Sequence, residues 1–196
     1  GNRRVATLKL LEQRSKLDAV DIGRLDPAIF KAVPCVLHDE ADEVRQLIVM
    51  GLNHISGKKR WPAINQARLM KSLRDDHGLR PDDVCRSLGV SKREYNLSLQ
   101  TLALAEAYRN SDYGDQMTSE QFNLFREVLK APTLREWLSW SRDEEAAFDQ
   151  ANLERLFSWL SREPEPEDDE EPDTRTAPAD PVITTGAQVR ELARII

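Results

Sequence analysis

Apolar residues recur at spacings of three and four along most of the chain, as in helices that turn one face toward a core. This pattern predicts helices over residues 1–17, 40–55, 62–76, 118–131 and 149–161, and two shorter ones on either side of residues 88–90. A short apolar run at 33–37 is the one candidate strand. The predicted fold class is therefore mainly α, a helical bundle with room for one short strand.

The two shorter helices have the sequence signals of a helix-turn-helix. Pro81 suits the first turn of a helix, where its missing N–H costs nothing, and Gly89 can take the positive φ that ends one helix and starts a turn. Ser91 is a good N-cap for the next helix, and Glu94, three residues on, is its expected capping-box partner. The apolar residues of both segments fall on one face, as in two helices packed across a tight turn.

The second of these helices leaves a row of hydrogen-bond donors facing solvent. They are Lys92, Arg93, Asn96 and Gln100, with Ser91 at the helix start. Side chains of these types contact DNA phosphates and base edges, so the pattern favours DNA binding. The alternative is a structural helical hairpin with an ordinary polar outer face.

The distribution of charge supports DNA binding, although the 196-residue chain has a net charge of -6. Residues 51–110 carry a net charge of +5, whereas residues 111–160 carry -5 and residues 161–196 carry -6. A basic connection, Lys58-Lys59-Arg60, precedes the helix at 62–76 and belongs to this positive segment. A local basic surface governs attraction to phosphates, because charges beyond a Debye length are screened.

Residues 111–161 predict an acidic extension of three helices. Thr118 with Gln121, and Thr133 with Glu136, are expected to form two capping boxes. The Trp and Phe residues of this extension are expected in its core, and the alternative is a groove that docks a protein partner.

The C-terminal part of the chain divides into a linker and a further segment. Residues 162–182 are rich in proline and acid and predict a disordered linker. Residues 183–196 are expected to start a further C-terminal segment. Because the chain begins and ends inside amphipathic patterns, we expect it to be a piece of a longer protein.

Two segments carry candidate binding residues outside the helix-turn-helix. Gly1, Asn2, Arg3 and Arg4 stand at the start of the first helix, where free N–H groups and the helix dipole attract phosphate. On these four residues alone, a solvated basic helix start is the simpler interpretation. Asn53 and His54 end the helix at 40–55; no second His or Cys has ligand spacing to His54, so no metal site is predicted.

These motifs together resemble a known family. A GNRR-led helix, a helix that ends in NHIS, a basic W-P-x-x-x-x-A-R helix and G-L-x-x-x-x-V-x-x-x-L-G-V-S follow one another over about residues 1–105. This order is similar to the ParB-type partition proteins, and more broadly to the ParB/sulfiredoxin-like superfamily with an attached helix-turn-helix. The resemblance implies the C-terminal part of an α+β nucleotide-binding domain at 1–57 and a DNA-binding domain at 58–110.

In that family a G-x-R-R box binds the phosphates of a nucleotide, usually CTP. Gly1, Arg3 and Arg4 match this box, with Asn2 where glutamate is usual. A second family box, E-N-x-x-R, corresponds here to Asn53-His54-Ile55-Ser56-Gly57, in which all three defining residues are replaced. The resemblance therefore implies CTP or another nucleotide as a ligand, while the altered second box argues against magnesium binding and CTP hydrolysis.

We therefore expect a cytoplasmic, nucleoid-associated protein that binds double-stranded DNA as a homodimer and responds to a nucleotide. One alternative is an enzyme with a ParB-like domain, a nuclease or nucleotide hydrolase, although no carboxylate cluster or nucleophile–base pair is apparent. The other is a module that binds a protein partner through its acidic helices. No membrane segment is expected, since no run of about 18 apolar residues occurs, and Cys35 and Cys85 are expected as free thiols.

Overall fold

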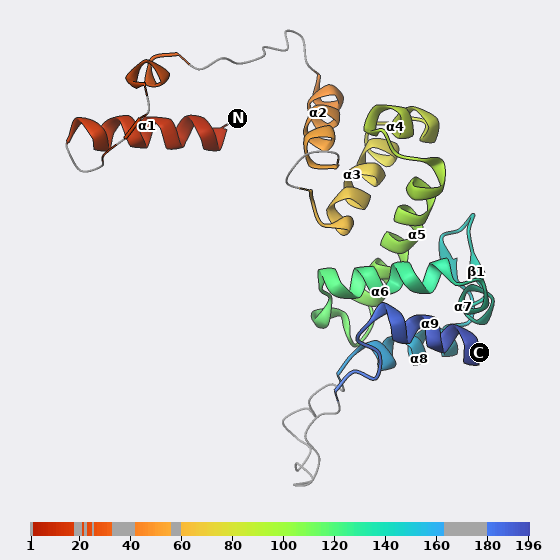
Figure 1. The fold of residues 1–196 in the computed structure, drawn as a ribbon. Helices are drawn as coiled ribbons and strands as arrows, with labels where there is room; N and C mark the ends of the chain where they lie inside the picture. Colours follow the sequence, from red (N-terminus) through yellow and green to blue (C-terminus); the bar gives the residue numbers. More distant parts are fainter. Residues whose placement is uncertain are drawn as a thin grey trace. The chain divides into compact units, whose positions relative to one another are not determined.

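The computed structural model describes residues 2–17, 21, 23–24, 26–32, 42–55, 60–162 and 180–196. The chain forms two compact units, Gly1–Ala41 and Asp42–Ile196 (Figure 1). The described residues are mainly helical, as predicted, with one small two-stranded sheet. None of the helices in these ranges combines the length and the apolar character needed to cross a membrane.

The first unit contains the helix α1 (Asn2–Lys16) and the 3₁₀-helix η1 (Pro27–Phe30). Asp26 caps η1 by accepting a 2.9 Å hydrogen bond from the backbone N–H of Ala28. The strand predicted at 33–37, and Cys35 within it, lie outside the described residues.

The second unit has a helix-turn-helix part followed by a C-terminal bundle (Figure 1). In chain order its elements are α2 (Glu43–Ile55), α3 (Ala63–Asp75), α4 (Pro81–Leu88), α5 (Lys92–Arg109), the 3₁₀-helix η2 (Gly114–Gln116), α6 (Ser119–Lys130), α7 (Pro132–Trp137), β1 (Trp140–Ser141), β2 (Ala146–Ala147), α8 (Gln150–Leu160) and α9 (Gly186–Ile195). The strands form an antiparallel hairpin that pairs Trp140 with Ala147 and Ser141 with Ala146.

A small core holds α3, α4 and the first half of α5 together. Its buried members are Leu69, Met70, Leu73, Val84, Leu88, Tyr95 and Leu99. The helix α2 packs against this core, although the sequence analysis groups it with residues 1–57. Gly51 permits the close approach, because a Cβ atom there would lie 2.6 Å from Leu69 Cδ2 and 2.9 Å from Leu88 Cδ2.

A second, larger core lies between the second half of α5 and the helices α6 to α9. Tyr108, Phe125 and Phe157 form its aromatic centre, with ring centroids 5.2 Å apart for Tyr108–Phe125 and 5.1 Å for Tyr108–Phe157. The Tyr108 hydroxyl lies 2.6 Å from Ser161 Oγ, so its polar end is satisfied inside the core. Because α5 contributes buried residues to both cores, it joins the two parts of the unit.

Capping explains where two of the predicted helices start and why one prediction is wrong. Thr118 and Gln121 form the predicted capping box at α6. At α7 the predicted box is absent: the helix begins at Pro132, and Thr133 Oγ1 donates to the Ala193 carbonyl at 2.8 Å. Trp140 then leaves the helical pattern, because α7 ends at Trp137 and Ser139 takes a φ of 49°.

The segment predicted to start a further region instead packs on the bundle. Thr185 and Gln188 form a capping box at the start of α9, and Val189 is buried. Arg190 of α9 lies 3.1 Å from Glu127 of α6. The helix α9 therefore contributes to the larger core.

Candidate nucleic-acid interface

The turn between α4 and α5 has the geometry that its sequence predicts. Pro81 occupies the first turn of α4, and Gly89 follows the helix with φ 67° and ψ 32°. This is the left-handed region, which glycine reaches without a Cβ penalty. The Gly89 N–H bonds the Cys85 carbonyl, so the turn also satisfies the end of α4.

The start of α5 is fixed partly by its own cap and partly by α6. The Ser91 hydroxyl accepts a 3.1 Å hydrogen bond from the Glu94 N–H, as predicted. The Glu94 side chain, however, accepts from Arg126 Nη2 at 2.7 Å and from Ser98 Oγ at 3.4 Å. Spacing along the chain gives no signal for the Arg126 contact, because the two residues lie 32 positions apart. The first turns of α5 are therefore held by a contact with α6.

The predicted contact residues of α5 lie at the surface. Lys92, Arg93 and Asn96 are exposed, and Gln100 is half-buried. Lys92 Nζ lies 3.2 Å from Asp82 Oδ1, but both side chains are 68% exposed. Exposed ion pairs of this kind contribute little stability, so the ammonium group can exchange its partner for a phosphate.

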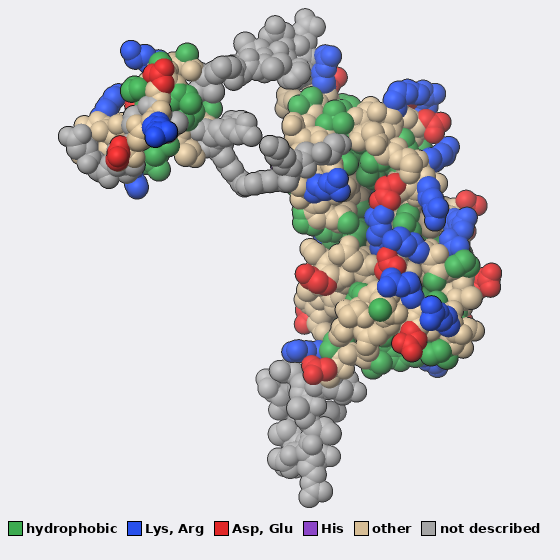
Figure 2. All heavy atoms as spheres, viewed as in Figure 1, with side chains coloured by type: hydrophobic (Ala, Val, Ile, Leu, Met, Phe, Trp, Pro, Cys, Tyr) green, Lys and Arg blue, Asp and Glu red, His purple; other side chains and the backbone are tan. Residues whose placement is uncertain are grey.

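A groove of about 520 Å³ runs along this face of α5. One wall carries Arg93, Asn96 and Gln100 of α5, and the other carries Lys130, Arg135 and Arg142 from the C-terminal bundle. Among the described residues, no carboxylate lines this groove. Figure 2 shows Lys and Arg side chains gathered over α5 and the β1–β2 hairpin, with some Asp and Glu side chains among them.

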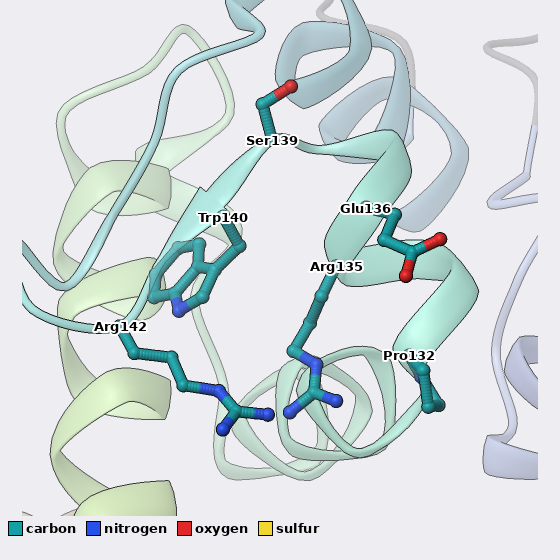
Figure 3. A pocket seen from close by; sticks show the side chains of 6 residues that line it. All are labelled: Pro132, Arg135, Glu136, Ser139, Trp140 and Arg142. Atoms are coloured by element: carbon teal, nitrogen blue, oxygen red, sulfur yellow. The ribbon is translucent and has the colours of Figure 1, made fainter.

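The far end of the groove opens into a smaller cavity of about 250 Å³ around two arginines. The guanidinium groups of Arg135 and Arg142 point toward one another; Glu136 also lines this cavity, with its carboxylate pointing away from them (Figure 3). Neither guanidinium has an ion pair within the part of the chain that the structure describes. Partial burial and repulsion from Arg142 lower the pKa of Arg135.

The β1–β2 hairpin holds Arg142 in this position. Ser139, directly before β1, and Glu145, directly before β2, have positive φ values of 49° and 51°, which cost about 1–3 kcal/mol each in residues other than glycine. Arg74 Nη1 of α3 lies 3.0 Å from Glu145 Oε1 and secures the hairpin to the helix-turn-helix part. Arg74 and Lys71 also lower the pKa of Asp75 to about 2, so this neighbouring carboxylate stays ionised at neutral pH.

No family model matches this chain, and no curated protein or solved structure matches it either. The function proposed below therefore rests on the site and on the sequence resemblance. In the described ranges, no three His, Cys, Asp or Glu side chains gather in a way that would hold a metal ion.

The other predicted site residues are only partly placed. Arg60 is exposed, and Lys58 and Lys59 lie outside the described residues. Asn53 Nδ2 donates to the Val49 carbonyl at 2.8 Å. The His54 ring stacks on Trp61 with centroids 4.6 Å apart.

At the predicted phosphate box, Gly1 lies outside the described residues, and Asn2, Arg3 and Arg4 form the first turn of α1 without a description of their side chains.

Lys130, Arg135 and Arg142 were not among the residues predicted from the sequence. They belong to a segment with a net charge of -5, and their neighbours in sequence include Glu127, Glu136 and Glu144. Their gathering depends on how α6, α7 and the hairpin pack beside α5, which spacing along the chain does not reveal.

Proposed function

We propose that this chain is a DNA-binding protein of ParB type that places α5 in the major groove of duplex DNA. The observation that carries the proposal is the exposed row of Lys92, Arg93 and Asn96 on a helix that begins directly after a helix-turn-helix turn. The major groove is about 12 Å wide and admits a helix of about 10–12 Å diameter. Recognition helices contact base edges with their N-terminal residues, and this row lies at the N-terminal end of α5.

The side chains of this row suit different parts of the duplex. Lys92 and Arg93 are cations in the first turn of α5, where they can reach backbone phosphates. Asn96 and Gln100 carry both a donor and an acceptor, the combination that pairs with an adenine edge in the major groove. We therefore assign phosphate contacts to Lys92 and Arg93, and base contacts to Asn96 and Gln100.

Replacing Lys92 and Arg93 together with alanine is expected to weaken duplex binding about 60-fold at 0.1 M salt. Each phosphate contact that is removed takes away about 0.9 log unit of affinity per tenfold change in salt, so the log–log salt slope should flatten by about 1.8. Fluorescence anisotropy with a labelled mixed-sequence duplex, titrated at several salt concentrations, measures both quantities.

The matched control is Arg109→Ala with Arg155→Ala, which removes the same charge from exposed positions that do not line the groove. Arg109 ends α5, about 25 Å along the helix axis from Lys92. Equal affinity and slope in both double variants would contradict the assignment of α5 as the recognition helix.

Regulation by a nucleotide is proposed from the family resemblance. In the GNRR box, Arg3→Ala with Arg4→Ala is expected to weaken CTP binding at least about tenfold, since a hydrogen bond to a charged group contributes about 1.5–3 kcal/mol. Isothermal titration calorimetry with CTP measures the change. Lys9→Ala with Arg14→Ala, two exposed cations of the same helix, is the control. An equal CTP affinity in both variants would contradict the assignment of the GNRR box as the phosphate site.

A further inference from the structure

The cavity at the end of the groove gathers the donor side chains of Arg135, Arg142 and Trp140. Glu136 and Ser139 also line it, and the Glu136 carboxylate points away from the two arginines. Arg135 and Arg142 face one another there, and Trp140 lines the same cavity (Figure 3). The Trp140 indole N–H is buried and has no hydrogen-bond partner among the described residues. Two like charges side by side are unfavourable, and so is an unpaired buried donor; an anion bound between these groups would offset both costs.

We propose that Arg135 and Arg142 form a second phosphate-binding site, which holds one backbone phosphate of the same duplex that α5 contacts. This inference rests on the proposed DNA-binding function and deepens it. The contact assigns a part in DNA binding to α7 and the β1–β2 hairpin, in a segment whose overall charge is negative.

The chemistry of the two side chains favours phosphate. A guanidinium group presents a planar fork of donors that matches two oxygens of a phosphate, and two forks can hold one phosphate from two sides. Arg142 is exposed, so it can contact a ligand that arrives from solvent. Arg135 is half-buried, so its side chain has less freedom to move.

The position of the pair favours DNA over a free anion. The cavity and the larger groove share Pro132, Arg135 and Arg142, so they form one continuous surface. At its other end this surface carries Arg93 and Asn96 of α5, the residues assigned to the duplex. A DNA backbone that passes along α5 would therefore meet the arginine pair.

The fold also fixes the backbone that carries Arg142 before any ligand binds. The positive φ values of Ser139 and Glu145 and the 3.0 Å ion pair from Arg74 to Glu145 fix the hairpin that carries Arg142. Strained residues that the surrounding structure enforces often mark functional sites. A backbone that is already fixed leaves less chain to order when a ligand binds.

The test is salt-dependent duplex binding by the Arg135→Gln, Arg142→Gln double variant. This variant removes one phosphate contact from the interface. The affinity for the labelled duplex should therefore fall about eightfold at 0.1 M salt, and the slope of log affinity against log salt concentration should flatten by about 0.9. The control Arg109→Gln with Arg155→Gln changes the net charge equally outside the groove and should match the wild type. Arg142→Gln alone, at the exposed member of the pair, should flatten the slope in the same direction, and circular dichroism melts establish that each variant is folded.

The outcomes separate this inference from the proposed function. A slope equal to that of the control, while Lys92→Ala with Arg93→Ala still weakens binding, would overturn the arginine-pair site and leave DNA binding in place. Duplex binding that none of the variants alters would overturn both. Calorimetric titration with inorganic phosphate and with CTP tests the other source of the anion: binding that the glutamine pair abolishes, with duplex binding unchanged, would assign the cavity to a free anion.

Discussion

Replacing Phe125 with alanine is expected to lower the free energy of unfolding by about 3–5 kcal/mol. Phe125 is fully buried on α6, and its ring lies 5.2 Å from that of Tyr108 and 6.0 Å from that of Phe157. Truncation removes the buried ring and leaves a cavity that its neighbours on α5 and α8 cannot easily close. Urea denaturation followed by circular dichroism measures the change.

Phe148→Ala provides the matched control for this prediction, because the Phe148 side chain is 60% exposed. Exposed substitutions usually change stability by less than about 0.5 kcal/mol. If both alanine variants unfold at the same urea concentration, Phe125 is not part of the bundle core that the structure describes.

Leu88→Ala is expected to destabilise the helix-turn-helix part by about 2–5 kcal/mol. Leu88 is fully buried at the last position of α4, directly before the turn at Gly89. Its side chain also packs against α2 at Gly51, where an added Cβ atom would lie 2.9 Å from Leu88 Cδ2. The cavity therefore weakens the packing of α2, α4 and α5 at once.

Hydrogen exchange and urea denaturation together locate this effect. Faster amide exchange is expected in α4 and in the first turns of α5, because the variant has fewer apolar contacts there and local opening costs less free energy. Leu52→Ala, at a position that is 41% exposed on α2, is the control and should leave exchange in α4 unchanged. Unaltered protection of α4 in Leu88→Ala would contradict the packing described for this small core.

Local sequence signals predicted the helical elements well because their causes are local. The spacing of apolar residues gave the approximate extents of α2, α3, α6 and α8. Gly89 and Ser91 marked the turn and the start of α5, since positive φ and an N-cap oxygen are properties of single residues. Thr118 and Gln121 likewise form their capping box within one turn.

The errors arose where distant parts of the chain compete for a side chain. Glu94 had the spacing of a capping-box partner for Ser91, but its carboxylate accepts hydrogen bonds from Arg126 of α6. Thr133 had the spacing of an N-cap, but its hydroxyl bonds α9, and Pro132 starts the helix.

The arginine pair could not be predicted for the same reason. Arg135 lies on α7 and Arg142 next to β1, and the hairpin that brings them together depends on positive φ at Ser139, a residue type that gives no signal for it. The net charge of a segment was misleading here, because it sums charges that lie on different faces of the fold. Residues 111–160 have a net charge of -5, yet their Lys130, Arg135 and Arg142 line one wall of the groove. The nucleotide prediction stays a prediction.

The single helix α5 has a mechanical consequence. Its 18 residues span about 27 Å without a break, and its two ends are anchored in different cores. The helix therefore fixes the distance between the two cores, and with it the distance from its own first turn to Arg135 and Arg142 across the groove. Under the proposed DNA-binding function, we expect duplexes whose groove width or bend already fits that spacing to be favoured over duplexes that must be deformed.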